Sequence, residues 1–239
     1  MRIDTVATLE DIKARHIDNR TVIVIDVLRA SSTIVTALES GFTSVIPVKT
    51  RNEALAMRSL NSIVAGEWHG KKLDGFDYNN SPSILKKKTT HTGKELILTT
   101  TNGTRAIEKA ASANKLLIGC FLNASSCIKE AINQNRNLTL YCAGTRGEFA
   151  LEDGLAAGLM VSIIRTRVPS TETCDFSKAM ETCYLKLAKR LPDILFSTIT
   201  GKRLFENLNS EDIKYCGQVD ISNIVPILIE NRIVSIHPS

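Results

Sequence analysis

Four short segments of this sequence carry polar and charged residues where a hydrophobic core would not need them. The first begins at Asp26, after an apolar run, and includes Arg29, Ser31 and Ser32 at the start of a helical pattern. A carboxylate at the end of a buried strand is costly unless it is paired or binds a cation. The first turn of a helix has free N–H groups that favour an anion. The segment therefore indicates either a metal and phosphate site or a buried Asp26–Arg29 ion pair with a serine cap.

The second segment follows a short apolar run and contains Glu67, and it leads into a Gly- and Pro-containing stretch with Asp77 and Asn80. Such residues are also common turn formers. The third segment ends an apolar run with three threonines and turns through an Asn-Gly pair into a helical pattern. A plain capping turn would explain part of it. Its candidate anion-binding groups are Thr101, Asn102, Gly103, Thr104 and Arg105.

The fourth segment runs from Gly144 to a long helical pattern that opens with Glu152 and Asp153. Acidic residues in the first turn of a helix interact favourably with the helix dipole. That explanation suits one of these two carboxylates better than both. The other carboxylate is a candidate for metal binding or catalysis.

The elements that must position these segments alternate between short apolar strands and helices. We predict strands at 21–27, 44–48, 62–65, 95–99, 115–119 and 138–142, and helices at 31–40, 52–60, 104–113, 125–133 and 151–165. Continuous apolar strands that alternate with helices predict an α/β fold, with a largely parallel sheet covered on both faces. Because parallel strands end at the same edge, we expect Asp26, Glu67, Thr101, Arg105 and Asp153 to converge.

The rest of the chain changes pattern. Residues 66–94 have weak periodicity, which predicts a long functional loop region. After position 169 we predict helices at 178–190, 201–207 and 210–216, then a hairpin of 224–229 and 233–236. We interpret 1–239 as a single domain in which 170–239 form a helical and hairpin C-terminal extension.

Composition narrows the class of protein. With 43% hydrophobic and 23% charged residues, the 239-residue chain is not a disordered one. The net charge of +5 is mild and aromatic residues make up only 5%, so we expect an anionic small molecule and no nucleic acid as partner. No apolar run could cross a membrane. The N-terminus has no signal-peptide pattern, so a cytoplasmic location is expected. A homodimer is a base-rate expectation.

The cysteines and known phosphatase motifs give mostly negative information. The six cysteines form no Cys-x-x-Cys pair and have apolar neighbours, which indicates buried thiols in a reducing compartment. Zinc is not expected, because the four histidines show no ligand spacing. Asp26 is not part of an Asp-x-Asp motif, Cys142 is not followed by an arginine at the spacing of cysteine phosphatases, and no Walker loop is present.

The four segments together resemble the 2-phosphosulfolactate phosphatase (ComB) family of coenzyme M biosynthesis. The matching stretches occur in the order of the family, at 26–33, 66–70 with 75–82, 99–105 and 144–158. The resemblance implies a three-layer α/β/α fold with a largely parallel, mixed sheet. It also implies Mg²⁺-dependent hydrolysis of (R)-2-phospho-3-sulfolactate to 3-sulfolactate and phosphate. Trp68 stands where the family usually has an arginine, and Asn79 stands where a glycine is usual, so the acid part of the substrate could differ.

On this basis each candidate residue has a hypothetical role. Asp26, Glu67 and Asp153 would bind Mg²⁺, with Glu152 as a further ligand or a supporting group. Asp77 or Glu152 would take a proton from the attacking water, and Asp26 as a covalent nucleophile is the competing scheme. The substrate-binding candidates are Arg29, Ser31, Ser32, Asn80, Thr101, Asn102, Gly103, Thr104 and Arg105.

Two other functions remain open from the sequence. One is a phosphatase for a different 2-hydroxy-acid phosphate. The other is a non-catalytic anion-binding protein with the same pocket, although such a protein would not need several converging carboxylates, because these repel an anion.

Overall fold

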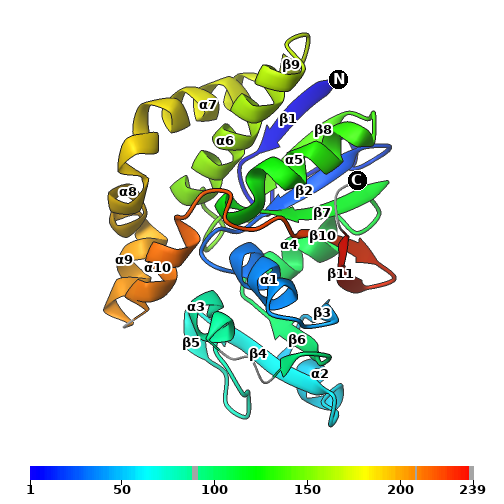
Figure 1. Ribbon diagram of the computed structural model, residues 1–239, viewed down its shortest axis with the longest axis vertical. Coiled ribbons are helices and arrows are strands. Elements are labelled where there is room, and N and C mark those ends of the chain that lie inside the picture. The colour runs from blue at the N-terminus through cyan, green and yellow to red at the C-terminus, as the bar shows by residue number, and fades with distance from the viewer. Residues whose placement is uncertain (88–90, 208, 237–239) are drawn as a thin grey trace.

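The computed structural model describes residues 1–87, 91–207 and 209–236, and its centre is one mixed sheet. The strand order is β5-β4-β6-β3-β11-β10-β7-β2-β8-β1-β9. The strands are β1 (Arg2–Val6), β2 (Thr21–Ile25), β3 (Ser44–Pro47), β4 (Ser62–Trp68), β5 (Lys71–Lys72), β6 (Glu95–Thr99), β7 (Lys115–Gly119), β8 (Leu138–Cys142), β9 (Glu172–Thr173), β10 (Val225–Ile229) and β11 (Arg232–Ile236). Figure 1 shows how they run through the middle of the molecule.

Two parallel sets of strands make up most of this sheet. In one set β2 lies between β7 and β8, and β1 and β9 follow on the far side of β8. In the other set β6 lies between β3 and β4. The core strands are β-branched and apolar along their length, as in the Thr-Val-Ile-Val-Ile run of β2, because both of their faces are covered.

The C-terminal hairpin joins the two sets. β10 pairs with β7 and β11 pairs with β3, each through a single antiparallel residue pair, Ile227–Leu117 and Ile233–Val45. The two hairpin strands are also antiparallel to each other. From β7 to β10, from β10 to β11 and from β11 to β3, each pairing is antiparallel. The set that contains β3 is therefore antiparallel to the set that contains β7. The chain therefore does not form one continuous parallel sheet.

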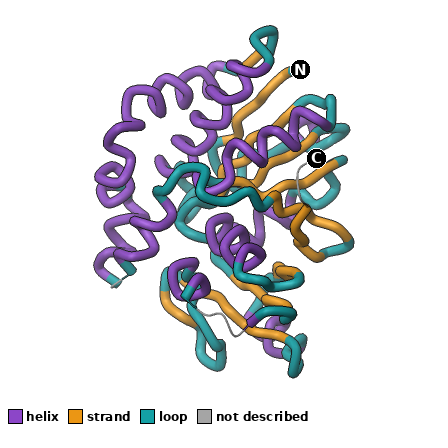
Figure 2. The backbone as a smooth tube through the Cα atoms, in the orientation of Figure 1, coloured by secondary structure: helices purple, strands orange, loops and turns teal. Residues whose placement is uncertain are grey.

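Helices cover both faces of the sheet and form the outer layers. Figure 2 draws these helices in purple and the strands in orange. Ile23 and Ile25 of β2 pack with residues of α5 and α6, whereas Val22 and Val24 pack with residues of α1 and α4. The helices are α1 (Ala30–Glu39), α2 (Arg51–Ala56), α3 (Pro82–Lys86), α4 (Gly103–Lys109), α5 (Ala124–Asn133), α6 (Leu151–Arg167), α7 (Asp175–Leu187), α8 (Leu191–Ser197), α9 (Ile199–Glu206) and α10 (Ser210–Cys216). The predicted three-layer α/β/α class is confirmed.

The last four helices form a curved wall from β9 to the neighbourhood of α3 (Figure 1). α10 contacts α3 and α9, so residues beyond position 198 are brought next to the loop that precedes α3. Among the described residues, no helix is long and apolar enough to cross a membrane.

The structure corrects several predicted elements. The region 66–94 is not one long loop, because β4 continues to Trp68 and is followed by β5 and α3; residues 88–90 of it lie outside the described residues. β4 runs through Gly66 and lies close to β6 at this position. A Cβ there would lie 2.3 Å from the carbonyl oxygen of Thr99 on β6, so the position has no room for a side chain. The glycine at this position therefore allows the close contact between β4 and β6.

Other differences concern elements with weak patterns. β1, β9 and α8 were not predicted, since β1 carries polar residues and the other two are short. α2 begins after Thr50, whose side chain accepts a hydrogen bond from the backbone N–H of Glu53, and not after Asn52. It also ends at Ala56, earlier than predicted.

Candidate active site

A polar pocket lies where the loops after β2, β6 and β8 meet the end of β4 and the wall of α9. It is lined by Asp26, Leu28, Arg29, Glu67, His69, Gly70, Asn80, Thr101, Asn102, Gly144, Thr145, Arg146, Thr200, Arg203 and Leu204. Residues that are far apart in the sequence thus converge. The pocket combines two buried carboxylates with three arginines, so it is equipped to bind both an anion and a cation.

Asp26 follows β2 directly and is buried at the pocket. Its Oδ1 accepts a hydrogen bond from the backbone N–H of Ala30, at the start of α1 (3.1 Å). Burial raises the pKa of Asp26 to about 7, and the nearby charges of Glu67 and Glu152 add to the rise. A carboxyl group with such a pKa can change its protonation near neutral pH, which is unusual for an aspartate and is typical of functional sites.

Asp153 is buried in the first turn of α6 and has both oxygens occupied. The backbone N–H of Val27 donates to its Oδ1 (2.8 Å) and that of Gly144 donates to its Oδ2 (3.0 Å). Burial raises the pKa of Asp153 well above its usual value, and the charges of Asp26 and Glu152 add to this effect. Asp153 does not line the pocket; it joins the loops after β2 and β8 that form the pocket floor.

Glu67 lies near the end of β4 and faces the pocket. Its Oε1 accepts hydrogen bonds from the backbone N–H (2.8 Å) and the hydroxyl (2.9 Å) of Thr101. Its Oε2 accepts the backbone N–H of Gly70 at 2.5 Å. Glu67 therefore connects β4 to the turn between β6 and α4.

Glu152 is a buried carboxylate with an unsatisfied oxygen. Its side chain is buried next to Asp153, and its Oε2 has no hydrogen-bond partner among the described residues. Glu152 does not line the pocket, but its charge adds to the rise in the pKa of Asp26. A buried acceptor without a partner is costly, so this oxygen is a candidate for contact with water or a cation.

The three arginines of the pocket come from distant parts of the chain. Arg29 is buried and forms an ion pair with Asp212 of α10 at 2.7 Å. The ion pair with Asp26, which was one of the two alternatives from the sequence, does not form. Arg146 is at the tip of a tight turn closed by two hydrogen bonds between Thr145 and Glu148, and it has a φ of 53°. Arg203 enters from α9 and donates to the hydroxyl of Thr145 at 3.1 Å.

Several predicted substrate-binding groups face away from the pocket. The hydroxyls of Ser31 and Ser32 donate to the carbonyls of Val24 (3.2 Å) and Val27 (2.8 Å), so they stabilise the loop after β2. Thr104 donates its hydroxyl to the carbonyl of Thr100 and lines a different groove. Asn80, Thr101 and Asn102, in contrast, line the pocket as expected.

Gly103 has a packing role that the sequence did not indicate. A Cβ at this position would lie 2.3 Å from Cβ of Ala30 and 2.6 Å from Oδ2 of Asp26. A residue with a side chain would push the turn before α4 away from α1. The close approach at Gly103 therefore brings the third polar segment against Asp26.

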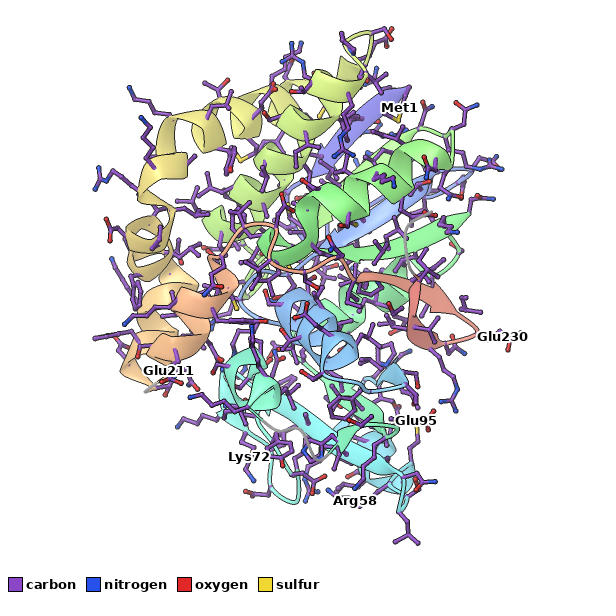
Figure 3. All side chains as sticks on the ribbon, in the orientation of Figure 1. Met1, Arg58, Lys72, Glu95, Glu211 and Glu230 are labelled. Carbon is purple, nitrogen blue, oxygen red and sulfur yellow. The ribbon has the colours of Figure 1, made fainter. Side chains whose placement is uncertain are left out.

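Asp77 and Arg105 both lie outside the pocket. Asp77 pairs with Arg58 at 3.0 Å and accepts the backbone N–H of Val64 at 2.8 Å, and Figure 3 shows Arg58 at the lower edge of the molecule. Arg105 pairs with Glu10 at 3.5 Å. It lines a neighbouring hollow that shares His69, Thr101, Asn102 and Arg146 with the pocket.

The two positions that depart from the family pattern lie beside the pocket. Trp68 is 56% exposed and lines the hollow next to Arg105, with its ring edge-on to His69. Asn79 accepts a hydrogen bond from the guanidinium of Arg29 at 3.3 Å and another from the backbone N–H of Asn80 at 2.8 Å. Asn79 therefore connects two residues that line the pocket.

Comparison with known proteins agrees with this geometry. A family model described as 2-phosphosulpholactate phosphatase matches residues 6–231. The chain belongs to the 2-phosphosulpholactate phosphatase family. Membership identifies it as a phosphoric monoester hydrolase, which confirms the family and the enzyme class expected from the four segments.

Relatives in this family match over nearly the whole chain. A protein of Caldanaerobacter subterraneus subsp. tengcongensis named probable 2-phosphosulfolactate phosphatase is 38% identical over 98% of both chains. A protein of Clostridium acetobutylicum with the same name is 35% identical over 95% of this chain and 97% of its own. A third, from Thermotoga maritima, is 38% identical over 89% and 91%.

Sequence reasoning did not select several pocket residues, including two of the three arginines, and it missed one buried partner. Arg146, Arg203 and Thr200 line the pocket, and Asp212 holds Arg29. Arg146 lies in the fourth polar segment, but it was not selected as a candidate residue. Arg203 and Asp212 are in amphipathic helices, where a charged residue is normally on the solvated face. Only the packing of α9 and α10 shows that these two point inward.

Proposed function

We propose that this chain hydrolyses (R)-2-phospho-3-sulfolactate to 3-sulfolactate and phosphate. The observation that carries the proposal is the single pocket that is lined both by Arg29, Arg146 and Arg203 and by the buried carboxylates of Asp26 and Glu67. Arginines bind phosphate, carboxylate and sulfonate groups through charge-assisted hydrogen bonds. The names of the relatives support the same substrate.

We also propose that Mg²⁺ is required. The described residues contain no group of three or more His, Cys, Asp or Glu side chains that could hold a metal ion. Mg²⁺ does not need one, because it keeps several waters and is bound through one or two carboxylates together with phosphate oxygens of the substrate. The unpartnered Oε2 of buried Glu152 and the mutual repulsion of the carboxyl groups around Asp26 suit a nearby cation.

Asp26 and Glu67 would hold the ion, since both line the pocket. Asp153, the third ligand of the sequence hypothesis, would act through the loops that it joins, because its two oxygens already accept backbone N–H groups. When bound, Mg²⁺ would neutralise charge on the phosphate oxygens. The arginines would orient the phosphate, and Asn80, Thr101 and Asn102 would contact its oxygens.

The chemical step that we propose is direct attack by water. The water oxygen bonds to phosphorus and its proton passes to Glu152. The bond to the ester oxygen breaks, that oxygen takes a proton from solvent to give the hydroxy acid, and Glu152 returns its proton to solvent. Glu152 does not itself line the pocket, but it is buried and its Oε2 has no partner among the described residues. It is preferred to Asp77 as proton acceptor because both oxygens of Asp77 are already used by Arg58 and Val64. In the competing scheme Asp26 attacks phosphorus and forms an acyl phosphate.

Release of inorganic phosphate from (R)-2-phospho-3-sulfolactate tests the proposal, with Mg²⁺ or with EDTA. We expect turnover with Mg²⁺, no turnover with EDTA, and a loss of about 100-fold or more in Asp26→Asn. Binding without turnover would instead support the non-catalytic anion-binding alternative. Turnover that survives EDTA would remove the role of Mg²⁺.

Two comparisons refine the mechanism. Glu152→Gln should reduce kcat far more than Asp77→Asn, and the reverse result would assign the base to Asp77. Rapid quenching during turnover should yield no phosphorylated protein, because trapping of an acyl phosphate on Asp26 would establish the covalent scheme.

A second substrate class is favoured by one observation. Trp68 is exposed beside Arg105 in the hollow that continues from the pocket, so the acid end of the substrate would meet an aromatic ring there. A panel of 2-hydroxy-acid phosphates that includes 2-phospholactate decides between the two. Higher kcat/KM for another acid would assign the chain to that substrate and leave the reaction class unchanged.

Other expectations remain predictions. A role in coenzyme M biosynthesis requires that phosphosulfolactate is the preferred substrate in the cell. A cytoplasmic location stays a prediction from the N-terminal sequence. We expect a homodimer and no affinity for nucleic acid, which light scattering and a gel-shift assay with the purified chain would check.

A further inference from the structure

Asp212 is a fully buried carboxylate that lies outside every segment singled out in the sequence. It comes from α10, and its Oδ2 accepts a hydrogen bond from Nη1 of Arg29 at 2.7 Å. The two side chains are only 1% and 2% exposed. A buried ion pair of this kind is strongly destabilised when one partner is removed, because the other charge is left unpaired.

We propose that Asp212 is a positioning residue for the active site, which holds the guanidinium of Arg29 in the pocket and keeps it from pairing with Asp26. This inference rests on the proposed function, since it takes Arg29 as a phosphoester-binding group. Asp26 is only three residues before Arg29, and both line the pocket. An Arg29 turned towards Asp26 would neutralise a carboxylate that the reaction needs.

The second oxygen of Asp212 organises another part of the pocket. Its Oδ1 accepts hydrogen bonds from the hydroxyl of Ser81 (2.8 Å) and from the hydroxyl (2.6 Å) and backbone N–H (3.1 Å) of Ser83. Ser81 directly follows Asn80, a buried residue that lines the pocket. One carboxylate therefore fixes both Arg29 and the loop that carries Asn80.

Only an ionised carboxylate satisfies all of these donors. The oxygens of Asp212 accept hydrogen bonds from one guanidinium, two hydroxyls and one backbone N–H. Of these groups, only a reoriented hydroxyl could accept a hydrogen bond from an amide. Asparagine has one acceptor oxygen and an NH₂ group that only donates. In Asp212→Asn, the NH₂ group would face either the guanidinium of Arg29 or the backbone N–H of Ser83. Neither of these groups can accept a hydrogen bond, so that contact would become repulsive.

The neighbouring residue Glu211 offers a matched control. It is on the same helix but is 68% exposed, and it pairs with Lys87 on the surface at 2.6 Å. Figure 3 labels Glu211 at the outer side of the molecule. Surface pairs of this kind contribute little to stability, so Glu211→Gln removes an acidic group from α10 without touching the pocket.

The test is a double-mutant cycle on the full chain, read by steady-state phosphate release with Mg²⁺. We expect Asp212→Asn to raise KM about tenfold or more, with a smaller decrease in kcat. Arg29→Lys should have a similar effect. In the double variant the two effects should not multiply in full, because Asp212 acts partly through Arg29 and partly through the loop that carries Asn80. Glu211→Gln should stay within about twofold of the unchanged chain.

Two results would overturn the inference: an unchanged KM in Asp212→Asn, or effects of Asp212→Asn and Arg29→Lys that multiply in the double variant. Multiplied effects would show that Asp212 acts only on overall stability. If Asp212→Asn does not fold, as judged by circular dichroism, Asn79→Ala takes its place. Asn79 is the second acceptor for the Arg29 guanidinium, and the same non-additivity with Arg29→Lys is expected.

Calorimetric titration with inorganic phosphate separates this inference from the proposed function. If the unchanged chain releases no phosphate from any ester tested, the proposed function fails. The positioning role would still be decided, because Asp212→Asn should weaken the binding of inorganic phosphate and Glu211→Gln should not. Equal phosphate affinity in all three proteins would contradict it.

Discussion

Glu67 accepts both the backbone N–H and the hydroxyl of Thr101, at 2.8 and 2.9 Å. Glu67 is the penultimate residue of β4, and Thr101 is in the turn between β6 and α4. Because both residues line the pocket, this contact fixes a carboxylate and a hydroxyl of the site relative to each other.

Thr101→Val should lower kcat/KM about three- to tenfold while leaving the fold intact, since valine has nearly the shape of threonine but no hydroxyl. The backbone hydrogen bond to Glu67 would remain, so the loss measures the hydroxyl alone. Thr101→Ser keeps the hydroxyl and is the control. Equal kcat/KM in the valine variant and the unchanged chain would show that this contact is not needed for the reaction.

Arg203→Gln should weaken the binding of anions. Burial lowers the pKa of Arg203, but a guanidinium still stays protonated at neutral pH and can bind phosphate. We expect the inhibition constant of inorganic phosphate to rise about tenfold. Lys202→Gln, an exposed change on the same helix, should leave it unaltered. An unchanged inhibition constant in Arg203→Gln would mean that α9 is not part of the anion site.

The metal-free protein should lose stability as the pH rises from about 4 to about 7. The pKa of Asp26 is raised from 3.8 to about 7 in the folded chain, so in this window the folded state holds a proton that the unfolded state has released. Above pH 7 the folded chain must carry the buried charge, and the stability contributed by the protonated form is lost.

Thermal melts in EDTA check this dependence. Asp26→Asn carries no charge, and its amide oxygen can still accept the N–H of Ala30, so it should melt higher than the unchanged chain at pH 8. The two melting temperatures should approach each other at pH 5. Parallel melting curves at both pH values would show that Asp26 does not titrate in this range.

Thiol labelling should distinguish the six free cysteines by burial. Burial raises the pKa of Cys120 to about 12, and it also raises the pKa values of Cys127, Cys142 and Cys216. These thiols are buried and scarcely form the reactive thiolate. Cys174 and Cys183 are partly exposed. We therefore expect at most two groups to react with an aromatic disulfide reagent in the native chain and all six in denaturant.

Local sequence patterns were sufficient for the fold class and for six of the residues that line the pocket, among them Asp26, Arg29 and Glu67. Continuous β-branched runs such as Thr21–Ile25 predict buried strands, because a strand covered on both faces must be apolar along its length. A polar group that directly follows such a run, such as Asp26, is conspicuous because its burial needs a reason. For this purpose the residue types and their order along the chain are enough.

The reason for the convergence, however, lies in the tertiary structure. A largely parallel sheet was expected to bring the strand ends to one edge, but the C-terminal hairpin separates two parallel sets that are antiparallel to each other. The segments meet instead through close contacts such as Gly103 against Ala30 and Asp26. Contacts without a side chain leave no distinctive signal in a single sequence.

The same limit applies to the partners of the charged residues. Arg29 was placed correctly as a pocket residue, yet its partner is Asp212, 183 positions later, and not Asp26. Which acidic residue pairs with an arginine depends on which helix packs beside it. For Arg29 this is set by the packing of α10, which local sequence patterns do not show. The chain's order of residues thus defines the chemical groups and their strands and helices, whereas long-range packing selects which groups face one another.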